Sequence, residues 1–281
     1  MLEYHHSMSQ VLAVDVGGTK TAIGIVDGTG TIVEKRIAPT PRGDASAVVT
    51  MVRSMVDSLG ERARSTVALG LALPGVMDRS GEVLLRSPSS GWYDVPFTRL
   101  FSDALGLKAI ADNDVNACAL AEAVFGSAVM LDSFFWITVS TGVGGALYQG
   151  RRVLAGAHGM AGEIGHLVVK PDGARCGCGN HGCLEAEAAG PAWSRKLIAQ
   201  QVGDSGAYAA AKGQTPLDAR AIAESARNGD ARCLRVVDQV SEALARGMAA
   251  VLTLFDPQAI FLGGGVAGAS DLLLPRIEAR L

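Results

Sequence analysis

Two parts of this chain follow one plan: an apolar strand, a polar turn rich in glycine, and then a second strand. The first turn is Asp15-Val16-Gly17-Gly18-Thr19-Lys20-Thr21, and the second is Thr141-Gly142-Val143-Gly144-Gly145. Because glycine has no Cβ, backbone N–H groups in such turns can point at phosphate oxygens. A plain hairpin turn would explain either copy alone. The repetition predicts two related α/β halves facing each other across a cleft, an N-terminal domain over residues 1–116 and a larger C-terminal domain over residues 117–281.

Phosphate binding is the chemistry that these turns favour. Thr19 and Lys20 add a hydroxyl and a positive charge, and Asp15 could hold Mg²⁺ through water, although the spacing is not that of a Walker A loop. A third glycine cluster follows the strand Ala259–Leu262, where a strand meets a helix, as nucleotide sites often do. The predicted nucleotide contacts are Asp15, Gly17, Gly18, Thr19, Lys20, Thr141, Gly142, Gly264 and Gly265.

Asp112-Asn113-Asp114 ends one predicted strand and opens a helix that runs to about Phe125. Asn and Asp are favoured at helix starts, so capping alone would explain them, and we expect Asn113 to cap. Asp114 in a strand-to-helix turn could also line the cleft, where a carboxylate would accept the proton of an attacking sugar hydroxyl. Both roles stay open at this point.

Four residues have the spacing of a metal site, His166-x9-Cys176-x-Cys178-x4-Cys183. Three cysteines within eight residues are poor disulfide geometry, whereas four such ligands match a closed tetrahedral zinc site. The zinc would be structural and would hold the loop 166–183. Cys118 and Cys233 lie in helical patterns and are expected to be buried. Glu163 and Glu185, close to this loop, are either solvated carboxylates or acceptors for sugar hydroxyls.

Composition excludes several classes of protein. Hydrophobic residues make up 48% of the 281 and charged residues 19%, which is globular rather than disordered. A net charge of −3 gives no sign of nucleic-acid or anionic-membrane binding. No uninterrupted apolar run reaches membrane-spanning length, and no secretory leader is recognised, so a cytoplasmic location is expected.

Together these motifs resemble the ROK family of bacterial sugar kinases and related repressors, over about residues 11–281. The most specific segments are Asp15–Thr21, Asn113-Asp114, Ser140–Gly145 and Ala161–Glu185. The resemblance implies an actin-like (ribonuclease H-like) two-domain α/β fold and phosphorylation of a hexose by Mg²⁺-ATP, most often at the 6-hydroxyl. It implies Asp114 as catalytic base and zinc on the His/Cys set. It also implies a homodimer and sugar contacts from Gly75, Asn113, Asp114, Glu163, His166 and Glu185.

The resemblance leaves the sugar open. Family glucokinases usually carry Asn where this chain has Ser89, and Ser140-Thr141-Gly142 looks more like the N-acetylmannosamine kinases, whereas Glu163 also fits glucokinases. Glucokinase is the first expectation, N-acetylmannosamine kinase the alternative, and fructokinase or a sugar-sensing regulator is less favoured, since only about ten residues precede the first turn and none forms a basic helix. Family members usually continue through another helix after the position where this chain ends, at Leu281.

Overall fold

The structure contains the predicted strands on either side of the first glycine-rich turn. The computed structural model describes residues 9–202 and 217–281, which fall into two units, one of residues 9–130 and 155–161 and one of residues 131–154, 162–202 and 217–281. The predicted boundary after residue 116 falls inside helix α4, which packs against strands of the first unit. The domain ranges of the sequence analysis therefore stay a prediction.

A five-stranded sheet in the order β3-β2-β1-β4-β8 is the centre of unit 1. The first three strands run antiparallel, β4 pairs with β1 in parallel, and β8 pairs with β4 in parallel. A second, three-stranded antiparallel sheet, β5-β6-β7, was not predicted. The elements are β1 Gln10–Val16, β2 Lys20–Val26, β3 Ile32–Pro39, α1 Ala45–Asp57, α2 Glu61–Arg64, β4 Thr66–Leu73, β5 Val76–Met77, β6 Leu84–Ser87, β7 Trp92–Val95, α3 Phe97–Leu105, β8 Ala109–Asn113 and α4 Asp114–Phe125.

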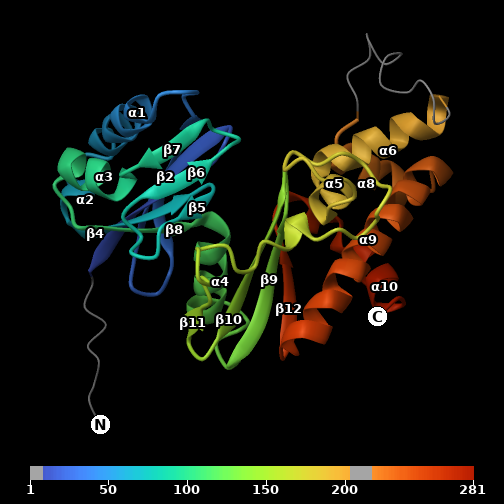
Figure 1. The fold of residues 1–281 in the computed structure, drawn as a ribbon. Coiled ribbons are helices and arrows are strands. Elements are labelled where there is room, and N and C mark those ends of the chain that lie inside the picture. Colours follow the sequence, from blue (N-terminus) through green and yellow to red (C-terminus); the bar gives the residue numbers. More distant parts are fainter. Residues whose placement is uncertain (1–8, 203–216) are drawn as a thin grey trace. The chain divides into compact units, whose positions relative to one another are not determined.

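The core of unit 1 follows from period-two burial. In β1 the buried side chains are Leu12, Val14 and Val16, which alternate with more exposed positions. Helices α1 and α3 contact each other and lie against the sheet (Figure 1). Phe97 and Phe101 of α3 are fully buried there and stack with ring centroids 5.9 Å apart.

Unit 2 is built on a four-stranded sheet in the order β11-β10-β9-β12. Strands β9 and β10 pair antiparallel, and β12 joins β9 in parallel. The elements are β9 Ser133–Val139, β10 Val143–Gln149, β11 Arg152–Val153, the 3₁₀ turn η1 Ile164–His166, α5 Leu184–Ala188, α6 Gly190–Val202, α8 Ala219–Arg227, α9 Ala231–Phe255, β12 Ala259–Gly263, the 3₁₀ turn η2 Gly265–Ala269 and α10 Ser270–Glu278.

Helix α9 organises the helical layer of unit 2. It contacts α5, α6, α8 and α10 (Figure 1). Its buried face repeats at three- and four-residue spacing through Val236, Val240, Leu244, Met248 and Val251, as one face of a helix requires. Unit 2 thus has its own apolar core, which supports the turns and loops at the ends of its strands.

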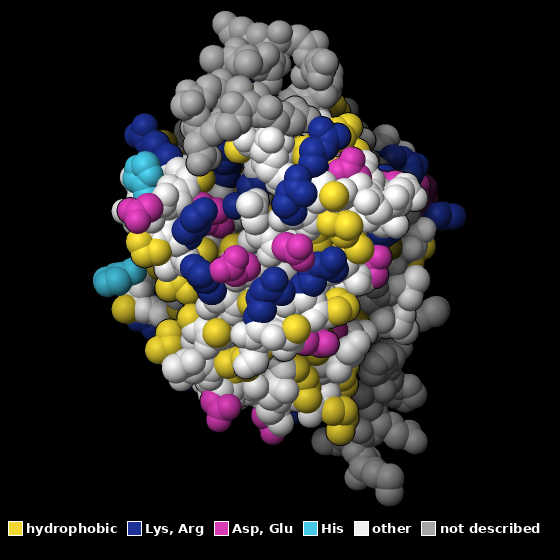
Figure 2. Space-filling model, turned by 90° about the vertical axis from the view of Figure 1, so that its right-hand side faces the viewer, with side chains coloured by type: hydrophobic (Ala, Val, Ile, Leu, Met, Phe, Trp, Pro, Cys, Tyr) yellow, Lys and Arg dark blue, Asp and Glu magenta, His cyan; other side chains and the backbone are white. Residues whose placement is uncertain are grey.

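The outer face of unit 2 mixes charges of both signs. Basic and acidic side chains lie side by side over much of it (Figure 2). Several form ion pairs between or within helices, including Arg276–Asp238 at 2.7 Å and Arg246–Glu242 at 2.7 Å. No helix in the described residues is long and apolar enough to cross a membrane.

Candidate functional site

The first glycine-rich turn joins β1 to β2 and is closed by its own backbone. The N–H of Gly17 donates to the carbonyl of Lys20 at 3.0 Å. Thr40, just after β3, holds the turn from the side: its hydroxyl donates to the Gly17 carbonyl at 2.7 Å and its N–H to the Thr19 carbonyl at 3.0 Å. Within the described ranges, no protein oxygen accepts the N–H of Gly18 or Thr19. Those two donors are available to an anion.

Besides restricted hydration, the charges of two carboxylates of unit 1, Asp114 and Asp15, both raise the pKa of the Cys118 thiol. The protein around Asp15 desolvates its carboxyl and raises its pKa, which the charges of Lys35 and Lys20 oppose. Restricted hydration, and then the charges of Asp114 and Asp15, raise the pKa of Cys118 to about 11. The predicted metal carboxylate and the predicted base therefore face one region of unit 1. Cys118 itself is exposed, which corrects the expectation of burial, because its position on α4 points away from the core that covers Ala119.

Asn113 caps α4 as predicted. Its side-chain oxygen accepts the N–H of Val115 at 2.8 Å and that of Asn116 at 3.2 Å, and its amide donates to the Gly75 carbonyl at 2.9 Å. The cap fixes the start of the helix, so Asp114 stands in its first turn directly after β8. One Asp114 oxygen accepts the N–H of Val115 at 3.0 Å. The structure thus brings three of the predicted sugar-side residues of unit 1 together.

The second glycine-rich turn, between β9 and β10, is shorter than predicted. The predicted loop ran from Thr141 to Gly145, but β10 begins at Val143, because the pairing with β9 continues to Val139. The turn is closed by the Ser140 N–H, which donates to the Gly142 carbonyl at 2.8 Å. In the part of the chain that the structure describes, no protein oxygen accepts the N–H of Thr141 or Gly142. Both turns therefore present two adjacent donors.

The third glycine cluster begins where β12 ends. Gly264 has φ +86°, and a Cβ there would collide with the Val139 carbonyl, so only glycine fits. Gly265 lines a cavity of about 740 Å³ together with residues of η2 and α8. Trp193 and Arg227 also line it, and the sequence did not point to either of them. By residue type, Trp193 would be taken for a core residue and Arg227 for part of a solvated helix face. A cavity of this size suits a small-molecule ligand.

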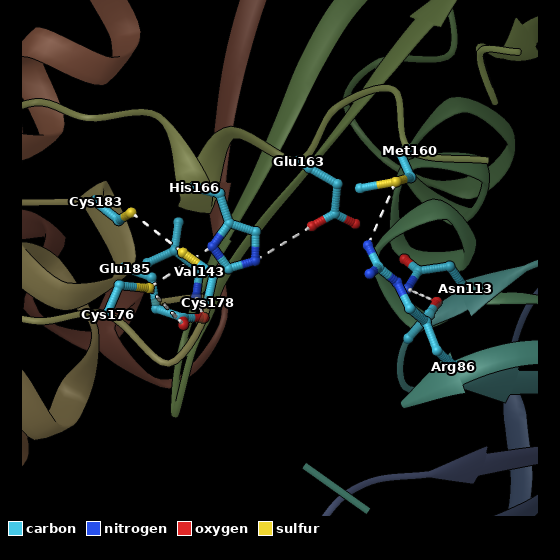
Figure 3. Close-up of polar contacts among 11 residues, drawn as sticks. Arg86, Asn113, Val143, Met160, Glu163, His166, Cys176, Cys178, Cys183 and Glu185 are labelled. Carbon is cyan, nitrogen blue, oxygen red and sulfur yellow. Dashed lines mark hydrogen bonds and ion pairs between the residues drawn. The ribbon is translucent and has the colours of Figure 1, made fainter. Parts of the chain in front are cut away.

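The four predicted ligands converge in unit 2. Their ligand atoms all lie within 4.8 Å of one another. Cys176 Sγ is 3.7 Å from His166 Nδ1, and Cys178 Sγ is 3.7 Å from Cys183 Sγ (Figure 3). A tetrahedral ion with sulfur ligands at about 2.3 Å would place those sulfurs about 3.8 Å apart. These residues can therefore hold a metal ion with little movement.

Protonation is part of this cluster's chemistry. Burial and the neighbouring cysteines raise the pKa of Cys183 to about 12. The metal-free thiol is therefore protonated at neutral pH, and a bound ion has to displace that proton. His166 uses its Nδ1 toward Cys176, while its Nε2 lies 4.0 Å from a Glu163 oxygen. The two ring nitrogens let one histidine face both a metal and a second group.

A buried ion pair supports the loop that carries the cysteines, and sequence reasoning missed it. Glu187 of α5 is only 3% exposed, accepts the Ala174 N–H at 2.7 Å and pairs with Lys196 of α6 at 2.5 Å. Although burial opposes ionisation, the Lys196 hydrogen bond and the Ala174 N–H hold the pKa of Glu187 below its usual value. The sequence signal for this ion pair is weak: two acidic residues, Glu185 and Glu187, follow Cys183.

The comparisons with known proteins identify the family. The pattern of the ROK family matches residues 11–281. This chain belongs to the ROK family. It is 33% identical to a glucokinase of Thermotoga maritima over 97% of this chain and 87% of that protein, and 34% identical to an N-acetylmannosamine kinase of Shigella flexneri over 94% and 85%.

A solved structure confirms the fold expected from the sequence. It is a ROK family glucokinase from Streptomyces griseus in complex with glucose and AMPPNP, with a TM-score of 0.84 and 32% identity, covering 97% of this chain and 88% of that one. The two α/β units of this chain are therefore the actin-like sugar kinase fold. The described residues contain both glycine-rich turns predicted from the sequence, one between β1 and β2 and one between β9 and β10.

We predict that Glu187→Ala loosens the cysteine loop. The change leaves Lys196, whose side chain is 14% exposed, without its partner and removes the acceptor of the Ala174 N–H. Breaking such a pair should cost about 3–5 kcal/mol, whereas the double change Glu187→Leu with Lys196→Met should cost far less. Thermal melting and amide exchange in the loop would measure this. Unchanged exchange at Ala174 in the single variant would contradict the assignment.

Proposed function

We propose that this ROK family chain is a sugar kinase that transfers the γ-phosphoryl group of ATP to a hexose hydroxyl, with glucose the favoured acceptor and its 6-hydroxyl the favoured position. The observation that carries the proposal is similarity to glucokinases over almost the whole chain, at 33% identity to the Thermotoga maritima enzyme. The geometry within each unit supports the proposal, because each glycine-rich turn leaves two N–H groups free and Asp114 stands in the first turn of α4.

ATP is the proposed donor. The free N–H pairs at Gly18-Thr19 and Thr141-Gly142 suit phosphate oxygens, and Lys20 adds positive charge. The related Streptomyces griseus glucokinase was solved with an ATP analogue, AMPPNP. In this chain the cavity of about 740 Å³ beside the third glycine cluster is the proposed seat of the nucleoside. Asp15, Gly17, Gly264 and Gly265 complete the proposed nucleotide contacts.

Asp114 is the proposed general base. The sugar hydroxyl oxygen attacks the γ-phosphorus, a new P–O bond forms, and the bond from that phosphorus to the bridging oxygen of ADP breaks. The hydroxyl proton passes to the Asp114 carboxylate. The N–H donors and Lys20 stabilise the negative charge on the transferring group. Proposed sugar contacts come from Gly75, Asn113, Glu163, His166 and Glu185.

Two metals complete the proposal. Zinc on His166, Cys176, Cys178 and Cys183 fits the donor set and the sulfur spacing, and with all four positions taken it would be structural. Mg²⁺ accompanies ATP and is usually held by one or two carboxylates besides the phosphates. Asp15 is an exposed carboxylate at the end of β1 and suits that part. Bound Mg²⁺ would neutralise phosphate charge.

N-acetylmannosamine is the alternative acceptor, favoured by 34% identity to a kinase for that sugar. The homodimer and the cytoplasmic location expected from the sequence stay predictions, as does the absence of nucleic-acid binding.

We predict that the protein turns over Mg²⁺-ATP with one sugar out of glucose, mannose, fructose, N-acetylglucosamine and N-acetylmannosamine. A coupled assay of ADP release, run on each sugar, measures this. Glucose should give the highest kcat/KM. Preference for N-acetylmannosamine would select the alternative, and no turnover with folded, zinc-loaded protein would refute the kinase.

We predict that Asp114→Asn lowers kcat by about 10²–10⁴-fold, because the base is lost while the shape is kept. Sugar affinity, measured by calorimetry, should stay within a few-fold. Asp103→Asn is the matched control, since that exposed aspartate of α3 only pairs with Arg99 at 3.6 Å. Lost sugar binding with phosphoryl transfer intact would contradict the role.

We predict that Cys178→Ser abolishes stoichiometric zinc binding and lowers the melting temperature, because a four-ligand structural site loses one thiolate. Metal content by mass spectrometry and thermal melting measure the two effects. Cys118→Ser, the same change at an exposed cysteine on α4, should keep both values. A Cys178→Ser protein with full zinc content and full stability would show that the cluster is not a zinc site.

A further inference from the structure

One carboxylate connects the cysteine cluster with the turn between β9 and β10. Glu185 Oε2 accepts the N–H of Val143 at 3.1 Å, and its Oε1 lies 3.9 Å from Cys176 Sγ (Figure 3). The two contacts use different oxygens. A single side chain of α5 therefore touches a proposed zinc ligand and the first residue after the proposed phosphate turn.

Gly142 and the Glu185 carboxylate lie in close contact. A Cβ on Gly142 would lie 2.5 Å from Glu185 Oε2, and Gly142 has no positive φ, so a side chain there would displace the carboxylate without straining the backbone. The other end of the turn is held by the start of α6, because the Gly190 N–H donates to the Ser140 carbonyl at 2.7 Å. Two residues that follow Cys183 in the chain, Glu185 and Gly190, thus hold the two ends of the turn.

The residue that makes these contacts lies close in the chain to a residue of the cysteine cluster. Cys183 is the residue just before α5, and Glu185 lies in the first turn of that helix. Because only Leu184 separates Cys183 from Glu185, the backbone that places the cysteine also places the carboxylate beside Gly142. The free N–H groups of Thr141 and Gly142 lie on the turn that this carboxylate fixes.

We propose that Glu185 is a positioning residue for the nucleotide: it holds the turn 140–142 in the form that binds phosphate and makes that form depend on the cysteine loop. This inference rests on the proposed kinase function. It adds to the expected sugar contact and does not replace it, because a carboxylate has lone pairs beyond the one that Val143 uses.

The test is nucleotide affinity without sugar. Zinc-loaded wild type, Glu185→Gln and Glu185→Ala would be titrated with AMPPNP and Mg²⁺ by calorimetry, with zinc content and circular dichroism as checks of integrity. Losing a charged hydrogen bond should weaken binding by about 10-fold or more in Glu185→Ala. Glu185→Gln keeps one oxygen acceptor and should lose clearly less. Glu278→Ala, at an exposed end of α10, is the control.

A double-mutant cycle tests the contact itself. Gly142→Ala places a methyl group against the Glu185 carboxylate and should weaken AMPPNP binding. In Gly142→Ala with Glu185→Ala the space is free, so the combined loss should be smaller than the product of the two single losses. Multiplicative losses would overturn the proposal, because they would show that the two residues act independently.

The outcomes separate this inference from the kinase proposal. If wild type phosphorylates a sugar and Glu185→Ala binds AMPPNP as tightly as wild type, only the positioning role is overturned. This holds even where Glu185→Ala binds the sugar more weakly. If wild type binds AMPPNP but phosphorylates no sugar, and Glu185→Ala binds AMPPNP more weakly than wild type, the positioning role is supported and the kinase proposal is refuted. Wild type that does not bind AMPPNP overturns both.

Discussion

The His/Cys cluster is the constraint on which the functional part of unit 2 depends. Between η1 and α5 the chain runs from Leu167 to Cys183 without a helix or a ladder, with isolated bridges at Val168–Cys183 and Arg175–His181. Few apolar side chains are buried there besides Cys176 and Cys183. Such a segment cannot offset its own conformational entropy by burial. Backbone hydrogen bonds, such as the one from the Val169 N–H to the Gly182 carbonyl at 2.9 Å, and the convergence of four ligand atoms together give it a defined shape.

In unit 1, hydrogen bonds of a single side chain fix the segment that carries the predicted base. The Asn113 side chain caps α4 and also ties the helix start to the Gly75 carbonyl at 2.9 Å. An amide can do both because it carries an acceptor oxygen and donor hydrogens. The start of α4 is therefore fixed relative to the chain after β4, and the position of Asp114 follows from it.

Local patterns predicted the parts of the structure that depend on local chemistry. The cap at Asn113 and the ligand cluster could be inferred from residue type and spacing alone. The strands β5 and β6 were missed, because two- and four-residue strands carry no periodic signal. Exposure of Cys118 and the Glu187–Lys196 pair were missed as well, since both are set by which elements pack together and not by the neighbouring sequence.

The two glycine turns both leave two adjacent N–H groups free and differ in what holds them. The turn of unit 1 is supported by Thr40, which lies just after β3 and whose hydroxyl donates to the Gly17 carbonyl. The turn of unit 2 is supported by Glu185, from a helix that begins where the cysteine loop ends. Thr40 directly follows a strand of the sheet, whereas Glu185 lies two residues after a cysteine of the cluster. If Glu185 positions the second turn as proposed, that turn depends on the cysteine loop and the first turn does not. A metal ion held by the cluster would then contribute to nucleotide binding through Glu185.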